Sequence, residues 1–391
     1  MSQRPINRSQ DLRRLRNEGY NLEVRDGHLL LKEVPYVNEK REVKRGIIVS
    51  KITLNNDVTQ PPGDHVAYFA GEYPCNKDGS RITEIQHQSG SQELLPGFFT
   101  NHSFSSKPAS GKYNDYYEKM TTYASILWHP AEALDPTATP KTFPVVTDEG
   151  EESVFQYVDT ASSRAGIGAV SDKLSGGTVA IVGLGGTGAY VLDMIAKTPV
   201  HEIHLYDGDD FLQHNAFRAP GAASLEDLEQ HPKKANYYAG VYSRMRRGIF
   251  AHPFDVDASN ADQVATAGFV FLCLGDGQAK RAIVDRLQAL GAEFIDCGIG
   301  VYHADEKLAG VIRVTSSTTT KRDHLPRYVT FTGAEDDEYA TNIQIADLNA
   351  LSAVLAVIKW KKRRGFYADL ENEHHTTYTI DGNAITNEEF Q

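Results

Sequence analysis

The segment at residues 178–189, Thr-Val-Ala-Ile-Val-Gly-Leu-Gly-Gly-Thr-Gly-Ala, constrains the fold of this chain more than any other. A short apolar run leads into Gly183, Gly185 and Gly188, and an apolar helical pattern follows them. Strand, glycine turn and helix in this order form a phosphate-binding unit, because glycine lets the backbone approach phosphate and the helix N-terminus offers free N–H groups. The segment therefore predicts a nucleotide-binding site.

Polar residues downstream separate two kinds of nucleotide-binding domain. Asp207 ends the next strand-like run, where a carboxylate can hold ribose hydroxyls in a dinucleotide-binding Rossmann domain. A dehydrogenase needs only this one acidic residue at the strand end. The chain goes on, however, with a further set of polar residues at Asp209, Asn215, Arg218, Lys233 and Asp276.

In these residues the sequence resembles the ThiF-type adenylyltransferases, the superfamily of ubiquitin-activating enzymes and of the activators of sulfur-carrier proteins. The shared pattern is a Gly-x-Gly-Gly-x-Gly loop, an Asp-x-Asp strand end, an Asn-x-x-Arg turn, a lysine at a helix start and an aspartate after the fourth strand. All five elements stand here in order, within about residues 155–385. The resemblance implies ATP-dependent adenylation of the C-terminal glycine of a ubiquitin-like or sulfur-carrier protein, with release of pyrophosphate.

The chemistry explains why these residue types are needed. A carboxylate is a weak nucleophile, so its attack on the α-phosphate of ATP requires neutralised phosphates and reactants held in line. The resemblance implies that Asp207 binds the ribose and that Asp209 is the second carboxylate of the pair. It implies that Arg218, Lys233 and Asp276 are catalytic, with Asp276 as the Mg²⁺ ligand. The remaining ATP-binding positions are Gly183, Gly185, Gly186, Gly188 and Asn215.

One further arginine belongs to this set by resemblance. Family members place an arginine just before the first Rossmann strand, where it reaches the ATP site of the partner subunit. Arg164, in Ser-Ser-Arg-Ala-Gly-Ile-Gly, occupies the equivalent stretch and is the fourth expected catalytic residue. The expected active unit is therefore a homodimer.

Length and composition predict a two-domain protein. A chain of 391 residues exceeds the roughly 250–300 at which single hydrophobic cores stop growing. We expect an α/β fold in which residues 151–391 form a Rossmann-like doubly wound sheet, the ThiF-type domain. Residues 1–150 read as a smaller α+β domain of unknown role, with carrier or partner binding as one possibility.

Charge and hydropathy narrow the class of protein. The net charge of −12 argues against nonspecific nucleic-acid binding, which calls for a basic stripe. The basic run at residues 359–364 ends a long helical pattern, and we expect it to be solvated. The chain has no run of about 18 apolar residues and no apolar segment at its start. A cytoplasmic protein that does not enter membranes is expected.

The cysteines bear on the fate of the adenylate. Three cysteines are too few for the paired Cys-x-x-Cys motifs of many relatives, so we expect no zinc. Cys273 and Cys297 lie in strand-like apolar runs and are expected to be buried, whereas Cys75 lies in a turn-like stretch and is expected to be exposed. The enzyme then stops at the adenylate, transfers it to the cysteine of a partner such as a conjugating enzyme, or uses Cys75.

Two other functions are compatible with parts of the sequence. An NAD(P)-dependent oxidoreductase would leave Asn215, Arg218 and Lys233 without a task. A catalytically inactive scaffold that binds a carrier protein would have no need of the intact set of ligands. We favour the activating step of a bacterial ubiquitin-like conjugation pathway over sulfur transfer, since the N-terminal extension and the missing zinc cysteines depart from the simpler activators.

Overall fold

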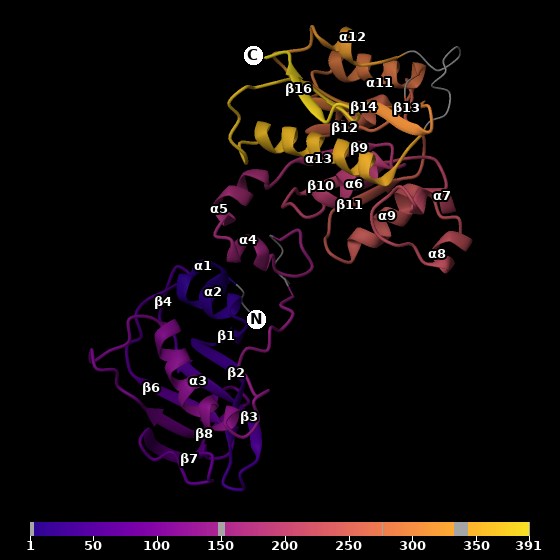
Figure 1. Cartoon of the computed structure of the whole chain (residues 1–391). Helices are drawn as coiled ribbons and strands as arrows, with labels where there is room; N and C mark the ends of the chain where they lie inside the picture. The colour runs from indigo at the N-terminus through magenta and orange to yellow at the C-terminus, as the bar shows by residue number, and fades with distance from the viewer. Residues whose placement is uncertain (1–3, 148–152, 276, 332–342, 391) are drawn as a thin grey trace. The chain divides into compact units, whose positions relative to one another are not determined.

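The computed structural model describes residues 4–147, 153–275, 277–331 and 343–390 (Figure 1). The chain forms two compact units, each with its own hydrophobic core. The first unit comprises Met1–Gly150 and Val158–Gly166, and the second comprises Glu151–Tyr157 and Ile167–Gln391. After residue 150 the chain therefore contributes residues 151–157 to the second unit and residues 158–166 to the first, before it continues into the second unit.

The first unit is built on an antiparallel sheet. Among the described residues this sheet has six strands in the order β1-β2-β3-β6-β8-β7. They are β1 (Asn21–Arg25), β2 (His28–Val37), β3 (Val43–Lys51), β6 (Val66–Ala70), β7 (Gln86–Leu95) and β8 (Phe98–Ser105). A separate small hairpin consists of β4 (Leu54–Asn55) and β5 (Val58–Thr59). The helices of this unit are α1 (Arg4–Arg8), α2 (Gln10–Asn17), α3 (Tyr116–Glu132) and α4 (Thr160–Arg164).

Helix α3 covers one face of this sheet because its apolar side chains recur at helical spacing. Tyr116, Met120 and Tyr123 are fully buried in the same core as Leu29 and Leu31 of β2. Asp115 starts the helix, and its side chain accepts a hydrogen bond from the backbone N–H of Glu118. The first unit is therefore a helix-on-sheet layer, as the α+β pattern predicted.

The second unit is built on a mixed sheet. Within the described residues it has eight strands in the order β11-β10-β9-β12-β13-β14-β15-β16. The parallel part consists of β9 (Thr178–Val182), β10 (Glu202–Tyr206), β11 (Ile249–His252), β12 (Phe269–Leu272) and the start of β13 (Phe294–Ala304). Antiparallel pairing continues through β14 (Lys307–Ser317), β15 (His375–Thr379) and β16 (Ala384–Glu388).

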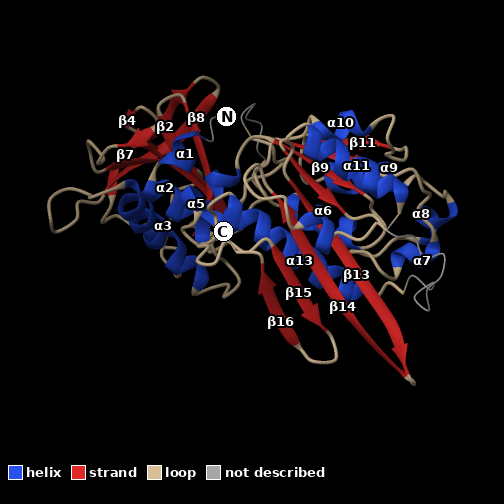
Figure 2. Ribbon diagram, turned by 90° about the horizontal axis from the view of Figure 1, so that it is seen from above, coloured by secondary structure: helices blue, strands red, loops and turns tan. Residues whose placement is uncertain are grey.

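Helices lie on both faces of this sheet, as the alternation along its strands requires. In β9, Ile181 shares a core with α6 (Thr187–Ile195) and α13 (Ala346–Arg363), whereas Ala180 shares a core with α10 (Ala261–Ala265) and α11 (Gln278–Ala289). Helices α6 and α13 pack against each other (Figure 2). The predicted Rossmann-like doubly wound fold is confirmed.

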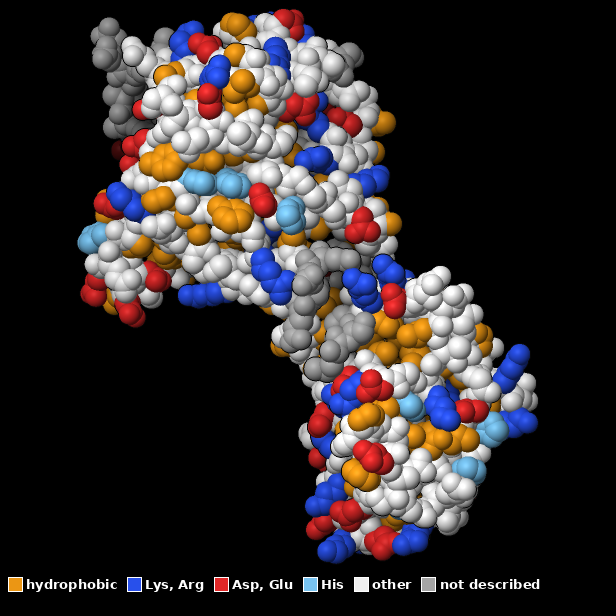
Figure 3. All heavy atoms as spheres, turned by 180° about the vertical axis from the view of Figure 1, so that it is seen from behind, with side chains coloured by type: hydrophobic (Ala, Val, Ile, Leu, Met, Phe, Trp, Pro, Cys, Tyr) orange, Lys and Arg blue, Asp and Glu red, His pale blue; other side chains and the backbone are white. Residues whose placement is uncertain are grey.

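Short helices complete the second unit. They are α5 (Gly168–Ser171), the 3₁₀ helix η1 (Asp172–Leu174), α7 (Gln213–Ala216), α8 (Leu225–Glu229), α9 (Lys234–Ser243) and α12 (Leu325–Tyr328). Among the described residues no helix is both long enough and apolar enough to span a bilayer. On the face drawn in Figure 3, acidic and basic side chains alternate without a continuous basic stripe.

The strand order places a switch point beside β9. From β9 the chain winds outward to β10 and β11, and it then crosses back to β12 on the other side of β9. Ligands of open α/β sheets bind at such a point, beyond the carboxyl ends of the strands. Gly183 and Asp207, two of the expected ATP-binding residues, are the first residues after β9 and β10 and so lie at this edge.

Candidate active site

The glycine loop follows β9 and leads into α6. Gly183 has a φ of +87°, and a Cβ built on it would lie 2.5 Å from the carbonyl oxygen of Cys273. A Cβ on Gly188 would overlap the carbonyl oxygen of Gly183. Only glycine allows this conformation and this close backbone approach. The loop therefore has the tight shape that the sequence pattern predicted.

The two middle glycines face side chains from other elements. A Cβ on Gly186 would overlap the side-chain amide of Asn349, which comes from α13. At Gly185 the nearest groups to such a Cβ are the Arg218 guanidinium at 3.8 Å and the Gln344 amide at 3.9 Å. The Asn-x-x-Arg turn and the start of α13 thus both lie beside the glycine loop.

Asp207 ties the end of β10 to the glycine loop. Its Oδ2 accepts a hydrogen bond from the backbone N–H of Leu184 at 2.7 Å, and its Oδ1 accepts one from that of Asp209 at 2.9 Å. Burial raises the pKa of Asp207 above its ordinary value, although these N–H groups and the ammonium of Lys234 act in the opposite direction. Asp207 orders the loop, and its role toward a ribose stays a prediction.

Two adjacent lysines have different environments at the start of α9. Lys233 is half-exposed, with its Nζ 2.9 Å from the carbonyl oxygen of Gly208 and 2.9 Å from Oδ1 of Asp210. The ion pair with Asp210 raises the pKa of Lys233. Lys234 is buried, and its Nζ lies 2.5 Å from Oδ2 of Asp209 and 3.5 Å from Oδ1 of Asp207. The sequence analysis missed Lys234, which joins both carboxylates of the Asp-x-Asp pair.

The Asn-x-x-Arg turn contains two buried donors that the described part of the chain leaves without an acceptor. Asn215 is buried, and its Oδ1 accepts a hydrogen bond from the backbone N–H of Leu212 at 2.8 Å. Its Nδ2 and the Nε of Arg218 have no hydrogen-bond partner among the described residues. Burial lowers the pKa of Arg218. Because unpaired buried donors are costly, two of them in one turn are suited to an acceptor such as a phosphate oxygen.

The positions of two expected catalytic residues relative to this group stay predictions. Arg164 belongs to the first unit, where its guanidinium lies 5.9 Å from the ring centroid of Phe143. Its position relative to the glycine loop stays a prediction. Asp276 lies outside the described residues. Among the described residues no group of three or more His, Cys, Asp or Glu side chains is arranged to hold a metal ion, so the magnesium site also stays a prediction.

Comparison with protein families identifies both parts of the chain. The model of the ThiF family matches residues 161–334, and the model of a domain of unknown function, DUF6791, matches residues 10–160. The chain contains a ThiF-family domain. ThiF-family adenylyltransferases use ATP, and this domain supports an adenylating enzyme. No curated protein matches the chain.

Solved structures also resemble part of the chain. A crystal structure of MccB from E. coli with MccA-N7isoAsn is 18% identical, with a TM-score of 0.45, and covers 59% of this chain and 69% of its own. MccB from E. coli with ATP is 18% identical, with a TM-score of 0.42, and covers 56% and 65%. A structure of PaaA is 16% identical, with a TM-score of 0.42, and covers 56% and 75%.

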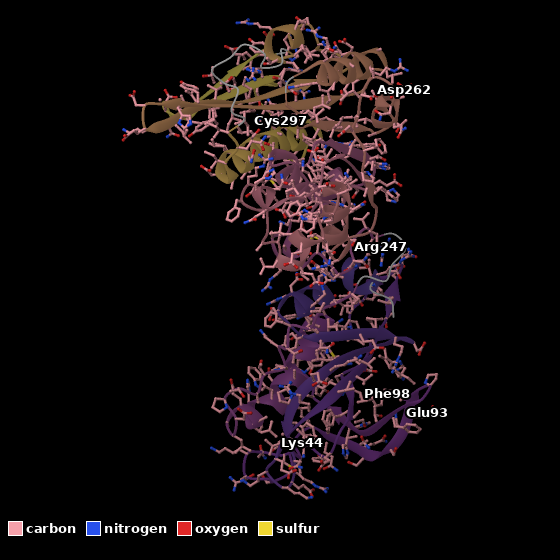
Figure 4. The ribbon with its side chains drawn as sticks, turned by 90° about the vertical axis from the view of Figure 1, so that its right-hand side faces the viewer. Lys44, Glu93, Phe98, Arg247, Asp262 and Cys297 are labelled. Atoms are coloured by element: carbon pink, nitrogen blue, oxygen red, sulfur yellow. The ribbon has the colours of Figure 1, made fainter. Side chains whose placement is uncertain are left out.

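The three cysteines of the chain differ from the expected pattern at two positions, Cys273 and Cys75. In the ThiF domain, Cys297 is buried in β13 (Figure 4), and its hydrogen bond with Cys273 and its burial both raise the pKa of its thiol. Cys273, the first residue after β12, is partly exposed, so the expectation of a buried Cys273 is wrong, because the strand ends at Leu272. In the first unit Cys75 is fully buried, and its backbone N–H donates to the carbonyl oxygen of Val37 at 2.7 Å. The expectation of an exposed Cys75 is wrong, because pairing with the core strand β2 draws this turn inward.

Proposed function

We propose that this chain uses ATP and Mg²⁺ to adenylate the C-terminal glycine of a ubiquitin-like or sulfur-carrier protein and releases pyrophosphate. One observation carries the proposal: two buried donors beside the glycine loop, Nδ2 of Asn215 and Nε of Arg218, have no acceptor among the residues that the structure describes. Phosphate oxygens would supply those acceptors. The glycine loop, Asn215 and Arg218 therefore fit a nucleoside triphosphate.

Each residue of the site has a task in this reaction. The backbone N–H groups of the glycine loop bind phosphate, and the forked guanidinium of Arg218 binds two of its oxygens. Lys233 supplies a point charge from an exposed position, once it exchanges Asp210 for phosphate. Asp276 would hold Mg²⁺, which would supply further positive charge next to the phosphates. With the negative charge of the phosphates neutralised in this way, the carboxylate of the carrier can approach and attack the α-phosphate.

The setting and the partners are part of the same proposal. We favour the activating step of a bacterial ubiquitin-like conjugation pathway, carried out in the cytoplasm by a homodimer. The first unit, which matches the domain of unknown function, is the part of the chain free to bind the carrier or another partner. The proposed boundary between the two domains is residue 150.

Burial of the thiols bears on what consumes the adenylate. Burial raises the pKa of the Cys75 thiol, which suppresses the reactive thiolate as well as access to it. Cys297 is likewise buried. An acyl transfer to Cys75 is therefore disfavoured, and an external nucleophile, such as the cysteine of a conjugating enzyme, is the better acceptor.

The test is ATP–pyrophosphate exchange with the purified full-length protein and Mg²⁺. We expect exchange that depends on a carrier ending in a free glycine carboxylate. The same carrier with an amidated C-terminus is the matched control and should support none. Absence of exchange together with tight NAD(P) binding would favour an oxidoreductase, and absence of binding to either nucleotide would favour an inactive scaffold.

A further inference from the structure

Asn349 connects three parts of the candidate active site. It lies near the start of α13 and is buried, although its side chain is polar. Its Oδ1 accepts a hydrogen bond from the hydroxyl of Thr187 at 3.1 Å, and its Nδ2 donates to the backbone carbonyl of Arg218 at 3.1 Å. Thr187 is the first residue of α6 and so ends the glycine loop. One amide therefore joins the loop to the Asn-x-x-Arg turn.

The same amide also supports the glycine loop by direct packing. A Cβ on Gly186 would overlap the side-chain amide of Asn349, so this side chain fills the space next to the bare Cα. Five residues earlier, the amide of Gln344 lies 3.9 Å from a Cβ built on Gly185. Gln344 and Asn349 thus both lie against the glycine loop.

The energetics favour a positional role for this side chain. A buried amide is stable only while its donor and acceptor are both satisfied. Both partners of Asn349 belong to phosphate-binding segments, which follow two different strands of the sheet, β9 and β10. Its hydrogen bonds therefore hold only while the loop and the Arg218 turn keep one relative position.

We propose that Asn349 is a positioning residue that holds the glycine loop and the Arg218 turn at the spacing required by the phosphates of ATP. The proposal rests on the proposed function, since it assumes that ATP is the ligand. It assigns to α13 a part in nucleotide binding, in addition to its packing on α6. Loss of the Asn349 hydrogen bonds should weaken the binding of the phosphates of ATP and not that of its adenosine part, because the two bridged segments are the expected phosphate-binding ones.

The test measures ATP and adenosine binding to the full-length protein by isothermal titration calorimetry, with thermal unfolding of each ligand-free variant alongside. In Asn349→Leu, which keeps a similar size but loses both hydrogen bonds without adding charge, we expect the Kd for ATP to rise roughly tenfold. Asn349→Ala should behave similarly. Thr187→Val, which removes only the hydroxyl partner, should raise it about threefold. The Kd for adenosine should stay within about twofold in all three variants.

Ser352 provides the matched control. It lies one turn further along α13 and is fully buried, and its hydroxyl has no partner among the described residues. Ser352→Ala should leave both affinities unchanged. Unchanged ATP affinity in the Asn349 variants would overturn the inference, as would a parallel loss of adenosine and ATP affinity, which indicates a merely structural role. If the Asn349 variants do not fold, Thr187→Val decides. Failure of the wild-type protein to bind ATP would instead contradict the proposed function.

Discussion

At the scale of single residues, Arg218 and Asn215 supply the buried hydrogen-bond donors of the candidate active site. Both lie in one short turn after β10, and each presents a buried nitrogen that no described group accepts from. Their spacing in the sequence identified them, since Asn-x-x-Arg needs only local structure to bring two donors to one side. Lys234 was missed because two adjacent lysines look alike in a sequence, and only burial separates the half-exposed Lys233 from its neighbour.

Replacement of Arg218 by lysine tests the need for a forked donor. Arg218→Lys keeps the charge but loses the guanidinium fork, so kcat/KM for ATP–pyrophosphate exchange should fall about ten- to a hundredfold, as expected from a charge-assisted hydrogen bond of roughly 1.5–3 kcal/mol. The control is Arg244→Lys, at an exposed position after α9. Equal activity of the two variants would remove Arg218 from the catalytic set.

At the scale of elements, edge strands escaped the sequence analysis. Strands β7 and β16 end the two sheets, and nearly all their residues are exposed or half-exposed. Such strands lack the alternation that predicts a strand, and they exist because β8 and β15 offer them hydrogen-bonding partners. The end of α13 also differs from expectation. Lys359 is buried against Glu373 at 3.0 Å, so this part of the basic run is not solvated.

Strand β15 and the residue before it make the second unit sensitive to acid. Burial lowers the pKa of His374 and of His375 to about 4, from an ordinary value near 6.5. The unfolded chain therefore takes up protons below about pH 6.5, whereas the folded chain does so only near pH 4. Stability is fully present above pH 6.5 and falls toward pH 4, by up to about 1.4 kcal/mol per pH unit for each histidine.

Chemical unfolding at pH 7.5, 6 and 5 measures this dependence. His375→Gln removes one of the two protons, so its unfolding free energy should fall less steeply with pH than that of the wild type. His303→Gln is the control, since His303 is exposed near the tip of the β13–β14 hairpin, and it should retain the wild-type slope. A wild-type slope in His375→Gln would show that this histidine is not the source.

At the scale of the whole molecule, Arg164 raises the question of which chain completes the site. The contacts of Arg164 lie in the first unit, while the glycine loop, Asn215 and Arg218 lie in the second. An arginine that belongs to the first unit can act on the ATP site of its own chain or of a partner chain. The family resemblance favours the partner chain, and hence a homodimer.

Mixing two inactive variants distinguishes these arrangements. Arg164→Ala and Asp276→Ala should each abolish most exchange activity, and a mixture should recover up to about a quarter of it. The reason is that, on random pairing of dimers, one site in four carries an intact Arg164 and an intact Asp276. Asp276→Ala alone, at the same total concentration, is the control. No recovery in a mixture shown to form mixed dimers would place Arg164 in its own chain's site or outside catalysis.

The sequence by itself determined the α/β class, the glycine loop and the turn carrying Asn215 and Arg218, because each depends on residues close together in the chain. Tertiary structure decided the rest. It paired Lys234 with Asp209 and buried Cys75 beside Val37. It also brought Asn349 to the glycine loop, although Asn349 and Thr187 are 162 positions apart in the sequence. Such contacts depend on how the elements pack, which local sequence patterns do not encode.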